Sequence, residues 1–315
     1  MSGPVAILCS GQGGQHREMF HLVGEVPAAA PVFEAAARLL GGTDPRRFVH
    51  EAEEDALFAN RAGQILCCTQ ALAAWAMLGD ARPSSVVLAG YSVGELAAWG
   101  CAGLFDPAQT LQLAAERALA MDRTAPAGAG LAAIVGLRRD TLDALLRTHA
   151  LALAPLAVAI VNSPDSFVVG GAAEALDTCL AEARRLGATR TIRLRVSVPS
   201  HTPLLQQAGE AFGTLLDRQA LHPQGAGIRL LSGIDAETIR DPRTGLRKLA
   251  LQLARTIDWA GCLEACGEAG ATRFLELGPG SALARMVDTR MSPAARAVEQ
   301  FRTADGVQAW LAQQP

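Results

Sequence analysis

The residues of this chain that could do chemistry gather first around a serine. Ser92 lies between Gly90 and Gly94 in a Gly-x-Ser-x-Gly pattern. The apolar run at 86–89 indicates a buried strand, and a helical pattern begins directly after the serine. A serine in such a tight strand-to-helix turn is exposed at the end of a sheet, and small neighbours let the helix pass close by. The pattern predicts that Ser92 is a nucleophile; the alternative is a glycine-rich turn without chemistry.

A serine nucleophile needs a base, and His201 is the best placed of the six histidines. It lies between an expected strand and an expected helix, in a segment that Pro199 and Pro203 make stiff. A rigid loop at a strand end is a suitable place to hold a base. The other five histidines lie in polar loops or on helix faces, where we expect them to be solvated.

Other kinds of site find less support. The glycine-rich loop 10–15 lacks the Lys-Ser/Thr pair of a phosphate loop, but it could bring backbone N–H groups near a reacting atom. The seven cysteines are odd in number, lie mostly in apolar segments and form no Cys-x-x-Cys pair. We therefore expect buried reduced thiols, no metal site and a cytoplasmic location.

Composition limits the partners. Half of the 315 residues are hydrophobic and the net charge is −3, so we expect a large core and no nucleic-acid partner. Five arginines at 184–195 could form a docking face for an acidic partner, or could simply be solvated. No apolar stretch approaches 18 residues, so no membrane span is expected.

The order of the expected elements places this serine in an α/β fold. Strands and helices alternate over most of the chain, which favours a parallel sheet. Between 130 and 196 the order becomes strand, helix, strand, strand, helix, strand, which is typical of a ferredoxin-like unit. We therefore expect a core domain of residues 1–129 and 197–315 with an insert at 130–196. The last strand of the insert is expected over 189–196, and a helix of the core over 244–257.

Several motifs together resemble one known family, the malonyl-CoA:acyl-carrier-protein transacylases. They occur in the family's order and approximate spacing at residues 11–15, 90–95, 117, 162–164, 196–201, 252 with 259, and 276–280. The resemblance spans nearly the whole chain. It implies an α/β-hydrolase-like core with a ferredoxin-like insert, in agreement with the order of elements.

The resemblance also implies the roles of the reacting groups. Ser92 would attack the thioester carbonyl and become malonylated, and His201 would take the serine proton and return it to the departing thiol. The backbone N–H groups of Gln12 and Val93 would form the oxyanion hole. The main-chain carbonyl of Gln252 would orient the histidine in place of an acid.

Substrate recognition follows from the same resemblance. Arg117 would grip the free malonyl carboxylate through its two-pronged guanidinium, and Asn162 would support the cleft as a hydrogen-bond donor. Malonyl-CoA would be a substrate, with no bound cofactor. Glu95 and Glu276 are left out of the expected site, because one suits a helix N-terminus and the other ends a strand.

One position departs from the family pattern, because Tyr91 stands where most members carry histidine. The run 90–100 looks like the transacylase subunit of bacterial malonate decarboxylase. The expected partner is then a carrier protein with a dephospho-CoA-type group. The phosphopantetheine carrier of fatty-acid or polyketide synthesis is the alternative acceptor. A serine esterase or thioesterase, and a non-catalytic protein that keeps the fold, are alternatives of other classes.

Overall fold

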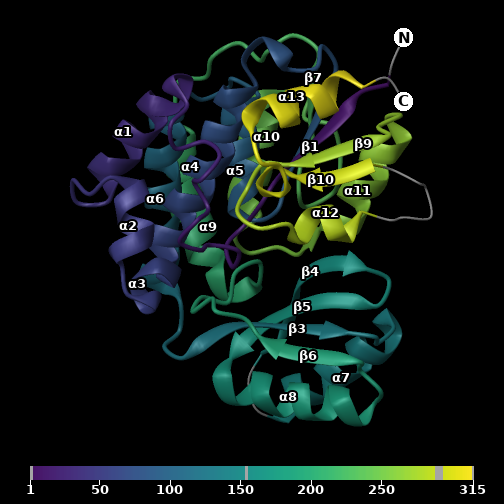
Figure 1. Cartoon of the computed structure of the whole chain (residues 1–315). Helices are drawn as coiled ribbons and strands as arrows, with labels where there is room; N and C mark the ends of the chain where they lie inside the picture. Colours follow the sequence, from purple (N-terminus) through teal and green to yellow (C-terminus); the bar gives the residue numbers. More distant parts are fainter. Residues whose placement is uncertain (1–2, 153–154, 288–293, 314–315) are drawn as a thin grey trace.

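The computed structural model describes residues 3–152, 155–287 and 294–313, and within these ranges the chain forms two five-stranded sheets (Figure 1). The larger part of the molecule is built around a parallel sheet, and the smaller part around a mostly antiparallel one.

The parallel sheet has the strand order β10-β9-β1-β2-β7. Its strands are β1 (Val5–Cys9), β2 (Val86–Gly90), β7 (Ile228–Leu230), β9 (Arg273–Glu276) and β10 (Ala294–Ala297). Every residue of β1 and β2 is buried, as expected for strands covered on both faces. Cys9 pairs with Gly90, and Leu8 with Glu276. The loops that follow β1, β2 and β9 therefore leave the sheet side by side.

Alternate residues of β1 face two separate apolar layers. Ile7 and Cys9 pack in the layer formed mainly by helices α1, α4, α5, α6, α9 and α10. Ala6 and Leu8 pack in the layer formed with α11 and α12. These helices are α1 (Ala30–Leu39), α4 (Asn60–Leu78), α5 (Val93–Cys101), α6 (Pro107–Thr124), α9 (Gln206–Leu216), α10 (Pro242–Leu251), α11 (Trp259–Glu268) and α12 (Ala282–Met286). Three further helices lie at the periphery, α2 (Pro45–Glu51), α3 (Glu54–Phe58) and α13 (Ala304–Ala312).

Helix α4 is buried in the larger part of the molecule and carries buried polar side chains. The stretch Asn60–Ala81 is long and apolar enough to cross a membrane, but 89% of its most apolar 18-residue window is buried inside the protein. Asn60 and Gln64 are nonetheless polar and buried, one turn apart on the same helix face. Buried polar side chains need hydrogen-bond partners, so this helix face must meet other polar groups.

The smaller sheet has the strand order β6-β3-β5-β4-β8. Its elements in chain order are β3 (Ala129–Val135), α7 (Arg139–Ala152), β4 (Ala157–Ser163), β5 (Ser166–Ala172), α8 (Ala173–Arg185) and β6 (Arg190–Arg193). Helices α7 and α8 cover the side away from the larger part (Figure 1). The fifth strand, β8 (Ile257–Asp258), comes from far outside this segment and pairs parallel to β4.

Two expected elements are shorter than predicted. The strand expected over 189–196 is β6 and ends at Arg193, and the helix expected over 244–257 is α10 and ends at Leu251. The periodic apolar residues Leu249, Leu253 and Ile257 are all buried and mimic a continuing helix. The helix ends early because the backbone carbonyls beyond Leu251 bind another segment, described below.

Candidate active site

Ser92 occupies a strained turn between β2 and α5. Its φ of 57° lies in the left-handed region, which a non-glycine residue rarely adopts. A Cβ at Gly90 would collide with the backbone nitrogen of Glu95, and one at Gly94 with the carbonyl of Cys9. Both glycines of the motif are therefore required by close backbone approach. The turn holds the Ser92 hydroxyl out at the end of the parallel sheet.

The imidazole of His201 meets this hydroxyl. Nε2 of His201 lies 2.8 Å from Oγ of Ser92, and Nδ1 lies 2.6 Å from the carbonyl oxygen of Gln252. Because a carbonyl only accepts, Nδ1 carries the hydrogen and Nε2 is left to accept the serine proton. The backbone N–H of His201 donates to the carbonyl of Leu253 at 2.8 Å. The early end of α10 thus supplies two carbonyls that fix this residue, whose φ is 63°.

Burial keeps this imidazole neutral. His201 is 1% exposed. Desolvation, reinforced by the positive charge of Arg117, lowers its pKa to about 3, although the bond to the Gln252 carbonyl opposes the shift. A neutral imidazole with a free Nε2 can act as a general base at neutral pH. The pair can therefore make an acyl-serine without a third carboxylate.

Two backbone segments lie beside Ser92. Val93 begins α5, so its N–H has no acceptor within the helix. The loop after β1 passes on the other side, and a Cβ at Gly11 would lie 3.4 Å from Cβ of Ser92. The side chain of Gln12 donates to the carbonyl of Asn60 at 3.2 Å, which ties the loop to α4. This arrangement suits the binding of a negative oxygen by the N–H groups of Gln12 and Val93.

Arg117 is a fully buried cation held by neutral groups. Its Nη1 donates to Oε1 of Gln64 at 2.8 Å and to the sulfur of Met121 at 3.4 Å, and its Nη2 donates to Oε1 of Gln252 at 2.9 Å. Burial lowers its pKa to about 10, so it remains charged at neutral pH. Its Nε has no hydrogen-bond partner among the described residues. A buried guanidinium with an unused donor is suited to a carboxylate ligand.

The family model described as an acyl transferase domain matches residues 7–238, which is most of the chain. This chain belongs to the acyl transferase domain family. It is an acyltransferase, and the predicted α/β fold with a parallel sheet is confirmed by solved structures of the same kind.

Two solved structures and one curated relative illustrate the similarity of this acyltransferase to known proteins. The malonyl CoA-acyl carrier protein transacylase of Bacillus subtilis is 27% identical over 285 residues, which cover 90% of this chain and 89% of that protein. The malonyl CoA-acyl carrier protein transacylase (fabD) structure from Coxiella burnetii matches with a TM-score of 0.89 at 26% identity, covering 100% of this chain and 98% of that one. A malonyl-transacylase in complex with its type II polyketide acyl-carrier protein matches with a TM-score of 0.88 at 25% identity, covering 97% and 99%.

The remaining predicted residue, Asn162, lies at the junction of the two parts of the acyltransferase. It is near the end of β4, and its side chain lowers the pKa of the Tyr91 hydroxyl, which burial raises more strongly. The Tyr91 ring packs edge-on against Trp259 with 5.3 Å between centroids. Oδ1 of Asn162 is buried with no partner in the described part of the chain. The structure thus places Asn162 beside the residue that precedes the nucleophile.

Three residues of this site were missed by the sequence reasoning. Gln64 holds Arg117, Asn60 accepts from Gln64 Nε2 at 2.8 Å, and Glu95 accepts from Gln252 Nε2 at 2.5 Å. A usable signal existed for the first two, because Asn60 and Gln64 are polar residues four apart in the long, mostly apolar α4, and buried polar groups need hydrogen-bond partners. Glu95 gave no such signal, since an acidic residue in a first helical turn is common.

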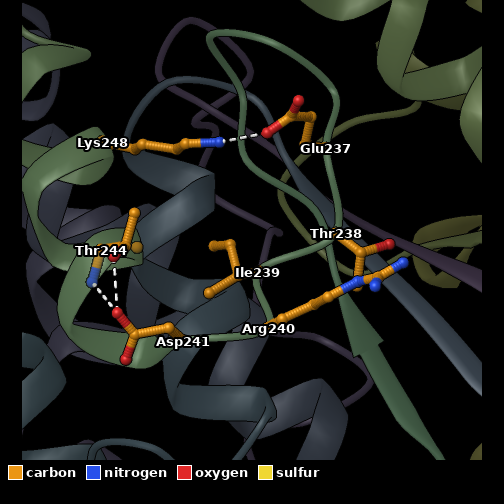
Figure 2. Close-up of a pocket in the computed structure, with 8 residues that line it drawn as sticks. Glu237, Thr238, Ile239, Arg240, Asp241, Thr244 and Lys248 are labelled. Carbon is orange, nitrogen blue, oxygen red and sulfur yellow. Dashed lines mark hydrogen bonds and ion pairs between the residues drawn. The ribbon is translucent and has the colours of Figure 1, made fainter.

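A separate cavity of about 460 Å³ lies at the other end of α10 (Figure 2). It is lined by residues of the segment 237–248, and in it Lys248 is paired with Glu237 at 2.7 Å. Asp241 caps the first turn of α10 here. None of the residues around Ser92 lines this cavity. Within the described ranges, no three His, Cys, Asp or Glu side chains are grouped to hold a metal ion.

Proposed function

We propose that this acyltransferase moves a malonyl group from malonyl-CoA to the thiol of an acyl carrier protein. The observation that supports this most is the buried Arg117. It keeps its charge and has a free Nε–H, and it is bonded to the side chain of Gln252, whose carbonyl also holds His201. A charged acyl group of the malonyl type would place its carboxylate on this free edge of the guanidinium while its thioester meets Ser92.

The first half of the reaction follows from the geometry. Oγ of Ser92 attacks the thioester carbon while Nε2 of His201 takes its proton. The N–H groups of Gln12 and Val93 stabilise the negative oxygen of the tetrahedral intermediate. Collapse breaks the carbon–sulfur bond, and the thiolate of CoA leaves with the proton from His201. The enzyme is then malonylated on Ser92.

The second half reverses these steps with a different thiol. The carrier's prosthetic thiol gives its proton to His201 and attacks the malonyl ester carbon. The carbon–oxygen bond breaks, and Oγ of Ser92 regains the proton. Water takes no part in these steps. If water reached the malonyl ester before the carrier thiol, the ester would be hydrolysed instead of transferred.

The acceptor we propose is the carrier protein of a malonate decarboxylase, which carries a dephospho-CoA-type group. The support is the sequence around the nucleophile, where Tyr91 packs on Trp259 in place of the histidine of most transacylases. The relatives named above are transacylases of acyl carrier proteins, one of them of a type II polyketide carrier, and a fatty-acid or polyketide carrier is the competing acceptor. The chemistry at Ser92 is the same with either.

The division of the chain that we propose is a catalytic core of residues 1–129 and 197–315 and a ferredoxin-like subdomain at 130–196. The strand order β6-β3-β5-β4 and the two helices on one side support it. The pairing of β8 with β4 ties this subdomain to the core. Asn162 at the end of β4 would then support the cleft from the subdomain side.

Intact-mass measurement after mixing with malonyl-CoA tests the proposal. We expect one malonyl adduct that is absent from Ser92→Ala. Adding each carrier protein in turn should discharge the adduct onto the malonate decarboxylase carrier faster than onto the fatty-acid carrier. Exclusive labelling of the fatty-acid carrier would replace the proposed acceptor. Rapid release of free malonate without a carrier would indicate a thioesterase, and absence of any adduct would indicate a non-catalytic protein.

A further inference from the structure

Glu95 is a buried carboxyl that the acyl-exchange steps do not use. It lies in the first turn of α5 and is 1% exposed. Its Oε2 accepts from Nε2 of Gln252 at 2.5 Å and from the backbone N–H of Gly233 at 3.1 Å. A Cβ at position 233 would lie 2.7 Å from this oxygen, so a glycine permits the approach. The burial of an acidic group is costly, and here two hydrogen-bond donors to Oε2 offset part of that cost.

The carboxyl determines which way the Gln252 amide faces. Nε2 of Gln252 donates to Glu95 and also to the carbonyl of Ser92 at 3.1 Å, whereas Oε1 accepts from Nη2 of Arg117. Exchanging the two ends of the amide would set its oxygen against two acceptors and its nitrogen against a donor. The amide oxygen is therefore held toward Arg117.

Gln64 holds the other side of the same guanidinium in the same way. Its Oε1 accepts from Arg117, and its Nε2 donates to Oδ1 of Asn60. Asn60 in turn donates to Asp122 at 2.8 Å. Gln252 and Gln64 thus both turn their amide oxygen toward Arg117, because the amide nitrogen of each donates a hydrogen bond to another group. Amide oxygens orient the guanidinium without neutralising it, which leaves the charge for an incoming anion.

We propose that Glu95 is a positioning residue for the acyl carboxylate: through the Gln252 amide it sets the orientation of Arg117 and thereby the preference for malonyl over uncharged acyl groups. The inference rests on the function proposed above. It assigns Glu95 no contact with the substrate. Its effect on the preference between acyl groups passes through Gln252 and Arg117.

The test measures the rates at which Ser92 is acylated by malonyl-CoA and by acetyl-CoA, and compares their ratio among variants. Glu95→Met has a side chain of similar length without an acceptor, and Glu95→Gln keeps an acceptor oxygen for both donors. We expect Glu95→Met to lower the malonyl-to-acetyl ratio about 30-fold, since misplacing a binding group by about 1 Å can cost about 100-fold. Glu95→Gln should keep the ratio within about threefold, because Gly233 and Ser92 still impose the same amide orientations.

A matched control and a second variant make the result decisive. Glu276→Met removes another buried glutamate that has no contact with Arg117, so it should change both rates by the same factor. Gln252→Met removes the amide but keeps the main-chain carbonyl for His201, and should lower the ratio as Glu95→Met does. The double variant Glu95→Met, Gln252→Met should be no worse than either alone, since both break one link. If Glu95→Met does not fold, Gln252→Met and Glu95→Gln carry the test.

The outcomes separate this inference from the proposed function. Malonylation of the wild-type protein with an unchanged ratio in Glu95→Met and Gln252→Met would overturn the inference alone. An equal fall of both rates in these variants would also overturn it, because a merely structural role predicts that. Absence of any malonyl adduct on the wild-type Ser92 would overturn the proposed function and the inference together.

Discussion

Two regions of this acyltransferase use a buried glutamate in different ways. Glu95 contacts the side chain that holds Arg117, whereas Glu276 at the end of β9 accepts from Oγ of Ser10 at 2.6 Å and from the backbone N–H of Ala284 at 2.8 Å. Burial raises the pKa of both carboxyls. The first region would face the malonyl group in the proposed function, and the second clamps the loop that follows β1.

The different contacts of Glu95 and Glu276 indicate which step of the proposed reaction each region can affect. A Cβ at Gly278 would collide with Cβ of Ser10, so the β1 and β9 loops lie in contact, and the clamp fixes the loop that carries Gln12. That loop would serve every acyl group, because every thioester develops the same negative oxygen. The Arg117 region would serve only acyl groups with a carboxylate. Changes in the two regions should therefore differ in whether they alter acyl selectivity.

The largest effect is expected from Arg117→Ala. Malonyl transfer should fall by about 100- to 1,000-fold, because removing one partner of a buried charge pair costs about 2–5 kcal/mol. Acetyl transfer should stay similar or improve. The two rates of Ser92 acylation measure this, with Arg117→Lys as the variant that keeps a charge but not the two-pronged geometry. Equal losses for both acyl groups would show that Arg117 does not recognise the carboxylate.

The next effect concerns the stability of Glu95→Gln as a function of pH. The pKa of Glu95 is about 7 in the folded protein, above its ordinary value of 4.5, mainly because the carboxyl is desolvated. The folded state then binds more protons than the unfolded one between these values, so the stabilising contribution is present below 4.5 and lost as pH rises through 7. Glu95→Gln has no carboxyl to titrate, so it does not lose this contribution. As pH rises from 4.5 to above 7, its free energy of unfolding should increase relative to that of the wild type by at most about 3 kcal/mol.

The measurement for Glu95→Gln is denaturant unfolding of both proteins at several pH values. The charged and titratable groups that face Glu95 are Arg117 on α6, Asp235 in the loop after β7 and Cys262 on α11. They are present in both proteins, as is His201, whose lowered pKa makes the fold lose stability as pH falls from 6.5 toward 3. The contribution of His201, which does not act on Glu95, cancels in the difference, so the difference reports Glu95 together with its coupling to Arg117, Asp235 and Cys262. A difference that does not change with pH would mean that Glu95 titrates normally.

A smaller effect is expected from Glu276→Ala. The loss of an acceptor for two donors should lower the free energy of unfolding by about 2 kcal/mol. Malonyl and acetyl transfer should fall by the same factor, since the loop serves both. Glu276→Gln is the control, because its amide oxygen can accept from Ala284 while Ser10 accepts from its nitrogen. A selective loss of malonyl transfer would erase the distinction between the two regions.

The smallest effect is expected from Ser10→Ala. Alanine keeps the Cβ that packs against Gly278, and only the hydroxyl is removed. One hydrogen bond is lost, so the free energy of unfolding should fall by about 1 kcal/mol. Thermal unfolding and the two acylation rates would measure it. A change in the malonyl-to-acetyl ratio would show that this loop contributes to acyl recognition.

How much the sequence could predict depends on whether a residue acts locally or across the chain. Ser92 was predictable because its strand, turn and helix are adjacent in sequence. The contact of Gln252 with His201 was expected only from the family resemblance, since 51 residues separate them. Glu95 was set aside as a helix N-terminal residue, and only the fold brings Gln252 and Gly233 to it. Local patterns cannot reveal such a contact.

The errors in the expected elements have the same origin. Apolar spacing predicted α10 through residue 257, but the carbonyls of Gln252 and Leu253 are taken by His201 and the helix ends. The strand β8 is two residues long and joins a sheet whose other strands lie between 129 and 193. The pairing of β8 with β4 depends on how the two parts of the molecule pack together, and the sequence of either strand alone does not reveal it.

The way α10 ends has a consequence for temperature dependence. Helix ends open before their centres, and the imidazole proposed to move protons at Ser92 is held by the carbonyls of Gln252 and Leu253, just beyond the C-terminal end of α10. On warming, the hydrogen bonds between His201 and these carbonyls should open well below the temperature at which the sheet unfolds. The acyltransferase would then lose turnover while its fold remains intact, and amide exchange at 252–254 would report the loss.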